Sequence, residues 1–287
     1  MSAGAKQLRA LLASDQLIVA PGVPDALAAR LVERAGFPAV YASGGAIARA
    51  MALPDLGLLS MSEVVDRVRP IAEAVDIPVI ADADYGYGNA LNVRRTVASF
   101  ERAGVAALHL EDQAAPKKCG HLDDKALIPA QEFAQKLRAA RDAATDPDLV
   151  LIARTDAIAV EGIEAAIQRA HLYHDAGADV LFVEAPESED QIVRIAQELP
   201  GPKLINMFHG GKTPLLSTQR LSEVGYRIVI IPSDLQRAAL HAMAEVLQAL
   251  KRDGDSHAFA ERMVSFQERE EIVGTETFLD LGKSYRD

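Results

Sequence analysis

The sequence predicts an α/β fold in which eight strands and their helices close into a (β/α)8 barrel of the TIM type. Eight short apolar runs alternate with segments of helical spacing, and near-continuous apolar runs are typical of parallel strands covered by helices. Eight such units favour a closed barrel over an open doubly wound sheet. The chain has 287 residues, of which 49% are hydrophobic, so it is long and apolar enough for one large barrel or two average domains.

Each predicted strand is short and largely apolar. The strands are expected at 17–20, 39–43, 78–82, 105–111, 149–154, 179–184, 203–207 and 227–231. The helices are expected at 4–13, 24–35, 62–75, 92–103, 129–144, 162–176, 190–199, 218–224 and 235–252. Gly36, Gly104 and Gly177 are expected to stop the helices that they follow. Ser62 is expected to cap a helix, with Glu63 just inside it.

The chain is expected to divide into a barrel catalytic domain, 1–254, and a C-terminal helical segment, 255–287. This segment is charged but has a helical apolar pattern, so we expect it to pack on the barrel or on a neighbouring subunit. Gly86-Tyr-Gly88 lacks the third glycine of a dinucleotide-binding fingerprint.

Composition excludes several classes of function. The net charge of −11 argues against nucleic acid and against an anionic membrane surface. A single cysteine excludes an intrachain disulfide and suits a reducing compartment. The N-terminus lacks the long apolar stretch of a signal peptide, and no run of about 18 apolar residues predicts a membrane span. We therefore expect a cytoplasmic protein whose partner is a small molecule.

Polar residues gather at the predicted carboxyl ends of the strands, which face the active site in a barrel of this type. These residues are Tyr41, Ser43, Asp82, Asp84, Glu111, Asp112, Arg154, Asp156, Glu184 and Asn206. The acids would repel one another unless positive charge lies among them, and an all-oxygen set suits Mg²⁺ or Mn²⁺. The alternative is that Asp82 and Asp84 only form turns or cap helices. Agreement across several strands favours the metal site.

Donors accompany these acids. Arg154 and Asn206 could bind carboxylate or enolate oxygens, and an arginine can do so with two parallel hydrogen bonds. The segment Ser43-Gly44-Gly45 supplies a hydroxyl and exposed backbone N–H groups for an anionic oxygen.

Residues 111–121 form a predicted loop that carries the only cysteine, Cys119. The neighbouring lysines are expected to lower its pKa and to favour the thiolate. A thiolate suits a nucleophile and not a proton donor, so the residues leave the role of Cys119 open. His121 could belong to the site or be an exposed loop histidine.

Specific motifs then resemble one known family. They are Tyr41-Ala-Ser-Gly-Gly45, Leu53-Pro-Asp-Leu-Gly57, Ala81-Asp-Ala-Asp-Tyr-Gly-Tyr-Gly-Asn89, Leu110-Glu-Asp-Gln113, Pro116-Lys-Lys-Cys-Gly-His121, Ile152-Ala-Arg-Thr-Asp156 and Asn206-Met-Phe-His-Gly-Gly-Lys-Thr-Pro214. Over about residues 8–287 the chain resembles the isocitrate lyase / phosphoenolpyruvate mutase superfamily, and within it the 2-methylisocitrate lyase-like proteins. The resemblance implies a homotetramer, built as a dimer of dimers whose last helices are exchanged.

The resemblance also implies the site. Mg²⁺ would be held through Asp82 and Asp84, partly by water, with Asp55 in the metal set. The implied catalytic residues are Cys119 as general acid, Tyr41 as base, Lys117, His121 and Glu111. The implied substrate-binding residues are Ser43, Gly44, Gly45, Gly120, Arg154, Glu184, Asn206, Arg237 and Arg269. The loop around Cys119 would close over the substrate.

The implied activity is cleavage of a carbon–carbon bond in a branched 2-hydroxy di- or tricarboxylate such as 2-methylisocitrate, with pyruvate as a product. Alternatives within the superfamily are 2,3-dimethylmalate lyase, carboxyphosphonoenolpyruvate phosphonomutase, and oxaloacetate hydrolase or decarboxylase. Arg237 and Arg269 favour the methylisocitrate substrate, whereas Phe208-His209 departs from the Thr-Glu pair usual in bacterial methylisocitrate lyases. Pro232 weakens the hydrolase alternative. A barrel that only binds a metabolite or a protein is a further alternative.

Overall fold

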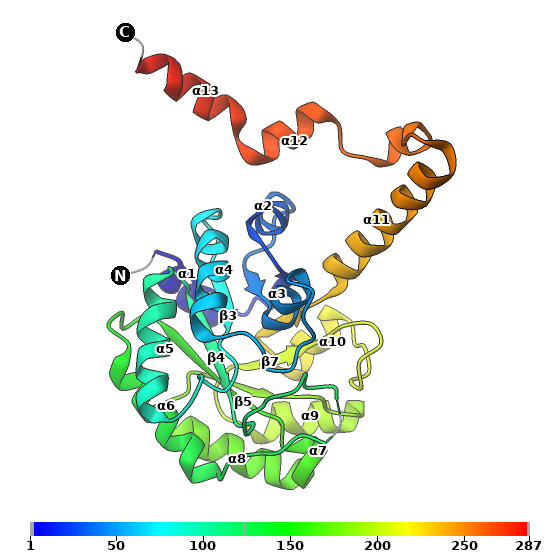
Figure 1. Cartoon of the computed structure of the whole chain (residues 1–287). Coiled ribbons are helices and arrows are strands. Elements are labelled where there is room, and N and C mark those ends of the chain that lie inside the picture. Colours follow the sequence, from blue (N-terminus) through cyan, green and yellow to red (C-terminus); the bar gives the residue numbers. More distant parts are fainter. Residues whose placement is uncertain (1–2, 123, 286–287) are drawn as a thin grey trace. The chain divides into compact units, whose positions relative to one another are not determined.

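The computed structural model describes residues 3–122 and 124–285, and it contains a closed barrel of eight parallel strands. Each strand pairs with the next one in the chain, and β8 pairs with β1 to close the barrel (Figure 1). The strands are β1 (Ile18–Val23), β2 (Val40–Ala42), β3 (Val79–Asp82), β4 (Ala107–Glu111), β5 (Val150–Thr155), β6 (Val180–Val183), β7 (Lys203–Asn206) and β8 (Ile228–Ile231). The predicted (β/α)8 barrel is confirmed.

Helices follow the strands and lie on the outside of the barrel (Figure 1). They are α1 (Ala3–Ala13), α2 (Ala26–Arg34), α3 (Gly44–Ala50), α4 (Met61–Glu73), α5 (Ala90–Arg102), α6 (Ala130–Ala143), α7 (Ile158–Glu161), α8 (Ile163–Asp175), α9 (Glu189–Glu198) and α10 (Thr218–Val224). Beyond the eighth strand come α11 (Asp234–Asp253), a short 3₁₀ helix (His257–Arg262), α12 (Phe266–Val273) and α13 (Thr275–Ser284). No helix of the described residues is both long and apolar enough to cross a membrane.

The core has two layers, which explains the continuous apolar runs. Successive strand residues point alternately into the barrel and out towards the helices. Ile80, Ile152 and Phe182 belong to the interior cluster, whereas Ala81, Leu151 and Val183 belong to the cluster between sheet and helices. Both faces of every strand are therefore buried.

Helix α1 is packed against the amino-terminal ends of the strands. Its Leu8 is fully buried in the interior cluster. Its Arg9 donates to the carbonyl oxygens of Asp148 and Leu149 and pairs with Asp179 at 2.8 Å, all of which lie just before β5 and β6. Because α1 occupies this end, the opposite, carboxyl-terminal end is the one that can receive a substrate.

Two local predictions were wrong. The cap of α4 is Ser60 and not Ser62: Ser60 and Glu63 form a reciprocal capping box, with the Ser60 N–H donating to Glu63 Oε2 at 2.8 Å. Strand β1 also continues past the predicted end at 20, through Pro21 and Gly22. Gly22 allows this because an added Cβ would lie 2.5 Å from the Cα of Pro232. The short helices α3 and α7 were not predicted.

The chain separates into two compact units, Met1–Asp234 and Leu235–Asp287. The predicted division at residue 254 differs from this one because α11 belongs to the second unit. Whether each unit is a domain in the functional sense stays a prediction, as does the exchange of the last helix between subunits.

Candidate active site

Carboxylates and cations meet at the carboxyl-terminal end of the barrel. Asp82 ends β3, and its Oδ1 accepts the backbone N–H of Asp84 at 3.0 Å, so the two acids are held close together by a local turn. Lys117, from the loop after β4, pairs with Asp84 at 2.7 Å and with Asp55 at 2.5 Å. Lys117 therefore supplies positive charge that offsets the repulsion expected among these acids.

These contacts shift the acids in opposite directions. Burial by itself raises the pKa of Asp82, but His109, followed by Lys117 and Arg154, lowers it to about 2. Burial raises the pKa of Asp84 to about 6, because Lys117 offsets only part of that effect and Asp82 adds to it. The pKa of Lys117 is raised well above its usual value: burial opposes this, and Asp84 and Asp55 outweigh it.

The donor set fits a hard divalent cation that keeps most of its water. In the described residues, no three His, Cys, Asp or Glu side chains are grouped so as to ligate a metal directly. Mg²⁺ commonly takes only one or two carboxylates and fills the remaining positions with water and substrate oxygens. Two buried acid oxygens of this region, Glu111 Oε1 and Glu184 Oε2, also have no hydrogen-bond partner among residues 3–122 and 124–285.

Tyr41 lies beside Asp82 inside the barrel. Its hydroxyl lies 2.9 Å from His109 Nε2 and 3.3 Å from Asp82 Oδ2. Burial raises the pKa of Tyr41 well above 10, and Asp82 adds to the effect. Tyr41 is therefore a neutral phenol at pH 7. It can accept a proton from a substrate only as it passes its own to His109, since the lowered pKa of Asp82 makes that carboxylate a poor acceptor.

Arg154 at the end of β5 is held by two acids. Its Nε and Nη2 donate to Asp156 at 2.9 and 3.1 Å, and its Nη1 lies 3.3 Å from Glu111 Oε2. Its guanidinium also stacks on the ring of Phe182, 5.3 Å from the centroid. Arg154 is thus fixed in one orientation before any ligand binds.

The loop that carries Cys119 lies directly on these residues. Gln113 accepts the N–H of Lys118 at 2.8 Å and donates to its carbonyl at 2.9 Å, which anchors the loop. At Gly120, an added Cβ would lie 2.4 Å from Arg154 Nη2 and 2.6 Å from Glu184 Oε1. Gly120 has no room for a side chain because its backbone lies against Arg154 and Glu184.

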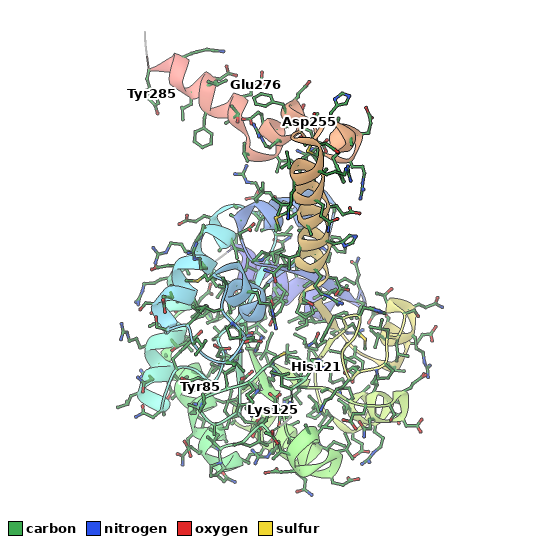
Figure 2. All side chains as sticks on the ribbon, turned by 45° about the vertical axis from the view of Figure 1, so that its right-hand side comes forward. Tyr85, His121, Lys125, Asp255, Glu276 and Tyr285 are labelled. Carbon is green, nitrogen blue, oxygen red and sulfur yellow. The ribbon has the colours of Figure 1, made fainter. Side chains whose placement is uncertain are left out.

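His121 faces the site and is not an exposed loop residue. Its side chain is 10% exposed, and its Nε2 lies 2.9 Å from Glu184 Oε1. Its Nδ1 accepts the backbone N–H of Lys212 at 3.0 Å, so Nε2 carries the proton and donates to Glu184. Asn206 Nδ2 donates to the same carboxylate oxygen at 3.1 Å. His121 and Lys125, both labelled in Figure 2, lie within the barrel unit.

The predicted low pKa of Cys119 was wrong. Burial raises the pKa of this thiol, and Asp55 raises it further. The adjacent lysines do not compensate, because Lys117 points to Asp55 and Asp84 and Lys118 donates to the carbonyl of Asp124. These surroundings favour the protonated thiol of Cys119 over the predicted thiolate.

Ser43, Gly44 and Gly45 lie at the start of α3. Ser43 caps the helix by accepting the N–H of Ala46 at 3.3 Å. An added Cβ at Gly44 would lie 2.7 Å from Asp82 Oδ2, and one at Gly45 would lie 2.9 Å from Asp55 Oδ2. The segment therefore packs directly against the acids.

Asp112 was expected in the site but points away from it. Its carboxylate accepts hydrogen bonds from Thr155, Tyr173 and the backbone N–H of Asp156, and it pairs with Arg169 at 3.2 Å. Asp112 is thus a structural residue, because neighbours in a strand point to opposite faces and Glu111 takes the inward one.

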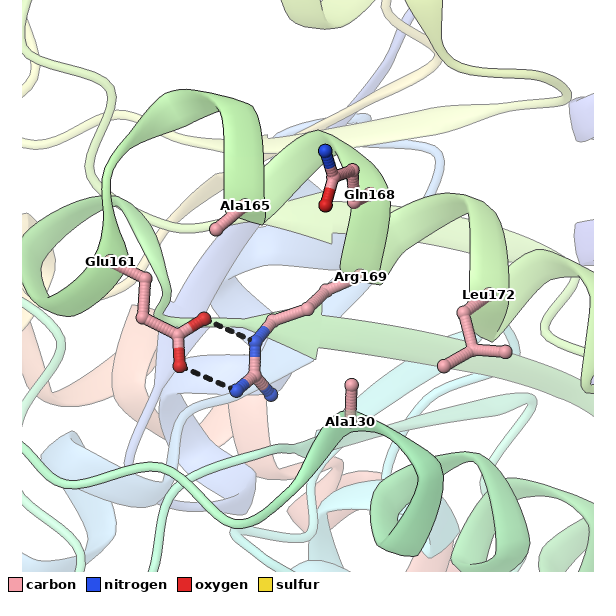
Figure 3. A pocket seen from close by; sticks show the side chains of 6 residues that line it. All are labelled: Ala130, Glu161, Ala165, Gln168, Arg169 and Leu172. Atoms are coloured by element: carbon pink, nitrogen blue, oxygen red, sulfur yellow. Dashed lines mark hydrogen bonds and ion pairs between the residues drawn. The ribbon is translucent and has the colours of Figure 1, made fainter.

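Arg169 also lines a surface pocket of about 310 Å³ beside α8 (Figure 3). Both oxygens of Glu161 hold its guanidinium at 2.7 Å. Because its Nη1 is engaged by Asp112, Ile128 and Tyr173 as well, Arg169 is turned to protein acceptors and not to this pocket.

Sequence reasoning missed His109 and Lys125. His109 precedes Glu111 by two residues and therefore faces inwards with it, which is a signal that could have identified it. Lys125 offers no such signal, because its partner Asp156 is distant in sequence. Arg237 and Arg269 belong to the second unit, in which Arg269 pairs with Glu270 at 2.9 Å, so their substrate contacts stay predictions.

Comparison with known proteins identifies the family. The family model described as phosphoenolpyruvate phosphomutase matches residues 8–251, and the chain belongs to this family of enzymes. The 2,3-dimethylmalate lyase of Eubacterium barkeri is 43% identical over 282 residues, 98% of each protein. A 2-methylisocitrate lyase of Aeropyrum pernix is 43% identical over 267 residues, which cover 93% of this chain and 86% of that protein.

Solved structures agree with this assignment. An oxaloacetate acetylhydrolase bound to 3,3-difluorooxalacetate has a TM-score of 0.94 and 35% identity, and the match covers 99% of this chain and 97% of that one. A phosphonopyruvate hydrolase in complex with oxalate and Mg²⁺ has a TM-score of 0.91 and 34% identity over 100% of both chains. The predicted superfamily is confirmed, and its members differ in substrate and reaction.

Proposed function

We propose that this enzyme is a Mg²⁺-dependent carbon–carbon lyase that cleaves a branched 2-hydroxy di- or tricarboxylate, such as 2-methylisocitrate, to pyruvate and a second carboxylate, succinate in that case. The observation that carries this proposal is the place of Cys119, a free thiol next to Gly120, whose backbone lies against Arg154 and Glu184; burial also raises the pKa of this thiol. A lyase of this kind needs a proton donor next to the carbanion that bond cleavage produces, and a thiol with a raised pKa meets that need.

Asp82 and Asp84, with Asp55 beside them, would hold Mg²⁺, and Mn²⁺ could replace it. When bound, the ion would polarise the oxygens of the 2-hydroxy acid. Arg154 binds the adjacent carboxylate, and Ser43, Gly44 and Gly45 supply donors near it. Support comes from the all-oxygen donor set and from the Mg²⁺ complex of the related phosphonopyruvate hydrolase.

The residues then perform a retro-aldol cleavage. Tyr41 accepts the proton of the 2-hydroxyl as its own phenolic proton moves to His109 Nε2, 2.9 Å away. The carbon–carbon bond breaks, and its electron pair remains on the carbon that becomes the α-carbon of the second carboxylate product. Cys119 then protonates that carbon. The covering loop excludes water, which would otherwise protonate the carbanion unselectively. Lys117 balances the charge of Asp55 and Asp84, and Glu111 pairs with Arg154. Glu184, which is bound by His121 and Asn206, also borders the site.

A second substrate, 2,3-dimethylmalate, is favoured by Phe208. Its ring lies edge-on to His121 with centroids 4.6 Å apart, so an apolar side chain lies beside the proposed site. The 2,3-dimethylmalate lyase of Eubacterium barkeri matches this chain over nearly its full length. A methyl-bearing malate suits this side chain better than a tricarboxylate does.

The test is pyruvate release with Mg²⁺, coupled to lactate dehydrogenase, with EDTA as the control. Methylisocitrate, dimethylmalate and oxaloacetate are assayed in parallel, and the loss of oxaloacetate is also followed directly. Oxaloacetate turnover alone would identify a decarboxylase where pyruvate forms, or a hydrolase where oxalate and acetate form without pyruvate. Cys119→Ser should abolish lyase turnover and leave substrate binding within about threefold. Full activity of Cys119→Ser would refute the lyase mechanism, and inactivity on all three acids would turn attention to a phosphonomutase.

We further propose a homo-oligomer in which other copies of the chain cover the second unit. Within this unit, taken by itself, large apolar side chains are exposed, among them Leu247 at 64%, Phe266 at 72% and Phe278 at 70%. Monomeric proteins rarely expose apolar groups at this density. Light scattering should give the mass of a tetramer, and Leu247→Glu should reduce that mass; an unmodified monomer mass would refute the proposal.

A further inference from the structure

Lys125 is a buried lysine for which the reaction has so far required no role. Its side chain is 1% exposed, and its ammonium lies 2.8 Å from Asp156 Oδ1. The same ammonium donates to the carbonyl oxygen of Gly120, the residue that follows Cys119. Burying a lysine is costly unless it is paired, so this geometry has to be strongly specified by its partners.

The contacts of Lys125 close a ring through the site. Asp156 receives the Lys125 ammonium on Oδ1 and holds Arg154 through both Oδ1 and Oδ2. Gly120 in turn lies against Arg154, so closely that it has no room for a Cβ. The contacts therefore form a closed cycle that runs from the backbone of Gly120 to the Lys125 ammonium, the Asp156 carboxylate, the Arg154 guanidinium and back to Gly120.

Charge balance gives Lys125 a second effect. Arg154 faces two carboxylates, Asp156 and Glu111, and without Lys125 these two would compete for a single cation. Burial raises the pKa of Glu111 well above its usual value, and Asp156 contributes to that shift. The Lys125 charge offsets one of the two carboxylates, which leaves Arg154 able to attract the carboxylate of a substrate.

We propose that Lys125 is a positioning residue: its ammonium joins the loop that carries Cys119 to the carboxylate that orients Arg154. The loop can then dock only where Arg154 is in place. This inference rests on the proposed function for the identity of the reaction, but the docking of the loop can be measured without any substrate.

The single cysteine makes that measurement clean, since thiol alkylation of the whole chain reports only on Cys119. The rate of iodoacetamide labelling is measured from pH 7 to pH 10, so that a change in thiol pKa is separated from a change in access. Removing hydrogen bonds from a charged donor typically shifts a local equilibrium by tenfold or more. Lys125→Met should therefore raise the pH-independent labelling rate at least tenfold.

Lys203→Met is the matched control. Lys203 is also buried and donates to a single carbonyl oxygen, that of Leu199, but it begins β7 at the opposite end of the barrel. Its loss should leave the labelling rate within twofold. Lys125→Gln, which keeps a polar side chain, replaces Lys125→Met if the latter does not fold. A labelling rate within twofold of the wild-type rate in a folded Lys125 variant would overturn the proposal.

Kinetics provide the second measurement. Because Arg154 loses its fixed orientation and the loop its anchor, Lys125→Met should raise KM and lower kcat, whereas a merely structural loss would lower the active fraction at constant KM. If none of the three acids is a substrate, the proposed lyase fails, while the labelling rate still decides the role of Lys125.

Discussion

Gly120→Ala tests whether the docked loop is the catalytically competent one. The φ angle of Gly120 is not in the left-handed region, so alanine is acceptable to the backbone there. The obstacle is steric, because the new Cβ would lie 2.4 Å from Arg154 Nη2 and 2.6 Å from Glu184 Cγ. Ordinary contacts between such atoms are about 3.5 Å or longer, so the overlap is about 1 Å.

Overpacking of this size costs about 1–3 kcal/mol, and about 1.4 kcal/mol corresponds to a tenfold change in an equilibrium. The docked population of the loop should therefore fall by about 5- to 150-fold. Pyruvate release should show kcat/KM reduced by a similar factor, and alkylation of Cys119 should become faster. Both effects share one cause, because undocking exposes the thiol and removes the proton donor from the site.

Gly282→Ala is the control for the glycine change itself, since Gly282 lies in α13, where an added Cβ would meet no described atom within 4 Å other than its chain neighbours and the backbone of its own helix. It should leave kcat/KM within about twofold. The melting temperature of Gly120→Ala should stay within a few degrees of the wild-type value, because the loop contributes little to the core. If Gly120→Ala retains full kcat/KM with unchanged Cys119 labelling, docking against Arg154 is not part of the catalytic cycle.

Three further results are expected. The raised pKa of Asp84, about 6, leaves its carboxyl protonated below that pH. Mn²⁺ affinity, measured by electron paramagnetic resonance, should therefore be constant above pH 7 and fall about tenfold per pH unit below pH 6. An affinity that stays constant down to pH 5 would contradict this. Arg154→Lys should lower kcat/KM at least about 100-fold in the coupled assay, since lysine cannot reproduce the two-point contact with Asp156; a loss under tenfold would count against it. Asp112→Asn should destabilise the fold by about 1–3 kcal/mol in urea unfolding, because the amide replaces an acceptor oxygen that Thr155, Tyr173 and Arg169 use, while Arg169 keeps Glu161; an unchanged midpoint would show that this network is dispensable.

The fold and much of the site were predictable because both follow from local patterns. Apolar runs alternating with helical periods require a parallel sheet with two buried faces, and eight of them close into a barrel. The rule that strand ends meet at one face then brings Asp82, Arg154 and Glu184 together without any long-range information. Asp112 does not follow this rule, because successive residues at a strand end point to opposite faces and Asp112 points away from the barrel interior.

What could not be predicted depends on side-chain direction. Adjacent lysines were expected to acidify Cys119, but a lysine side chain is long enough to carry its charge to a partner far along the chain, as Lys117 does with Asp55. The role of Lys125 depends in the same way on Asp156, 31 residues away. Residues that are adjacent in sequence can therefore place their charged groups too far apart to shift one another's pKa.

The contact between Gly44 and Asp82 has an evolutionary consequence. With only 2.7 Å between an added Cβ and a carboxylate oxygen, the turn that starts α3 and the end of β3 cannot change independently. A larger residue at position 44 would displace an acid of the proposed metal site, so an accepted substitution there needs a compensating change at position 82. Across related sequences, these two positions should therefore covary, although 38 residues separate them along the chain.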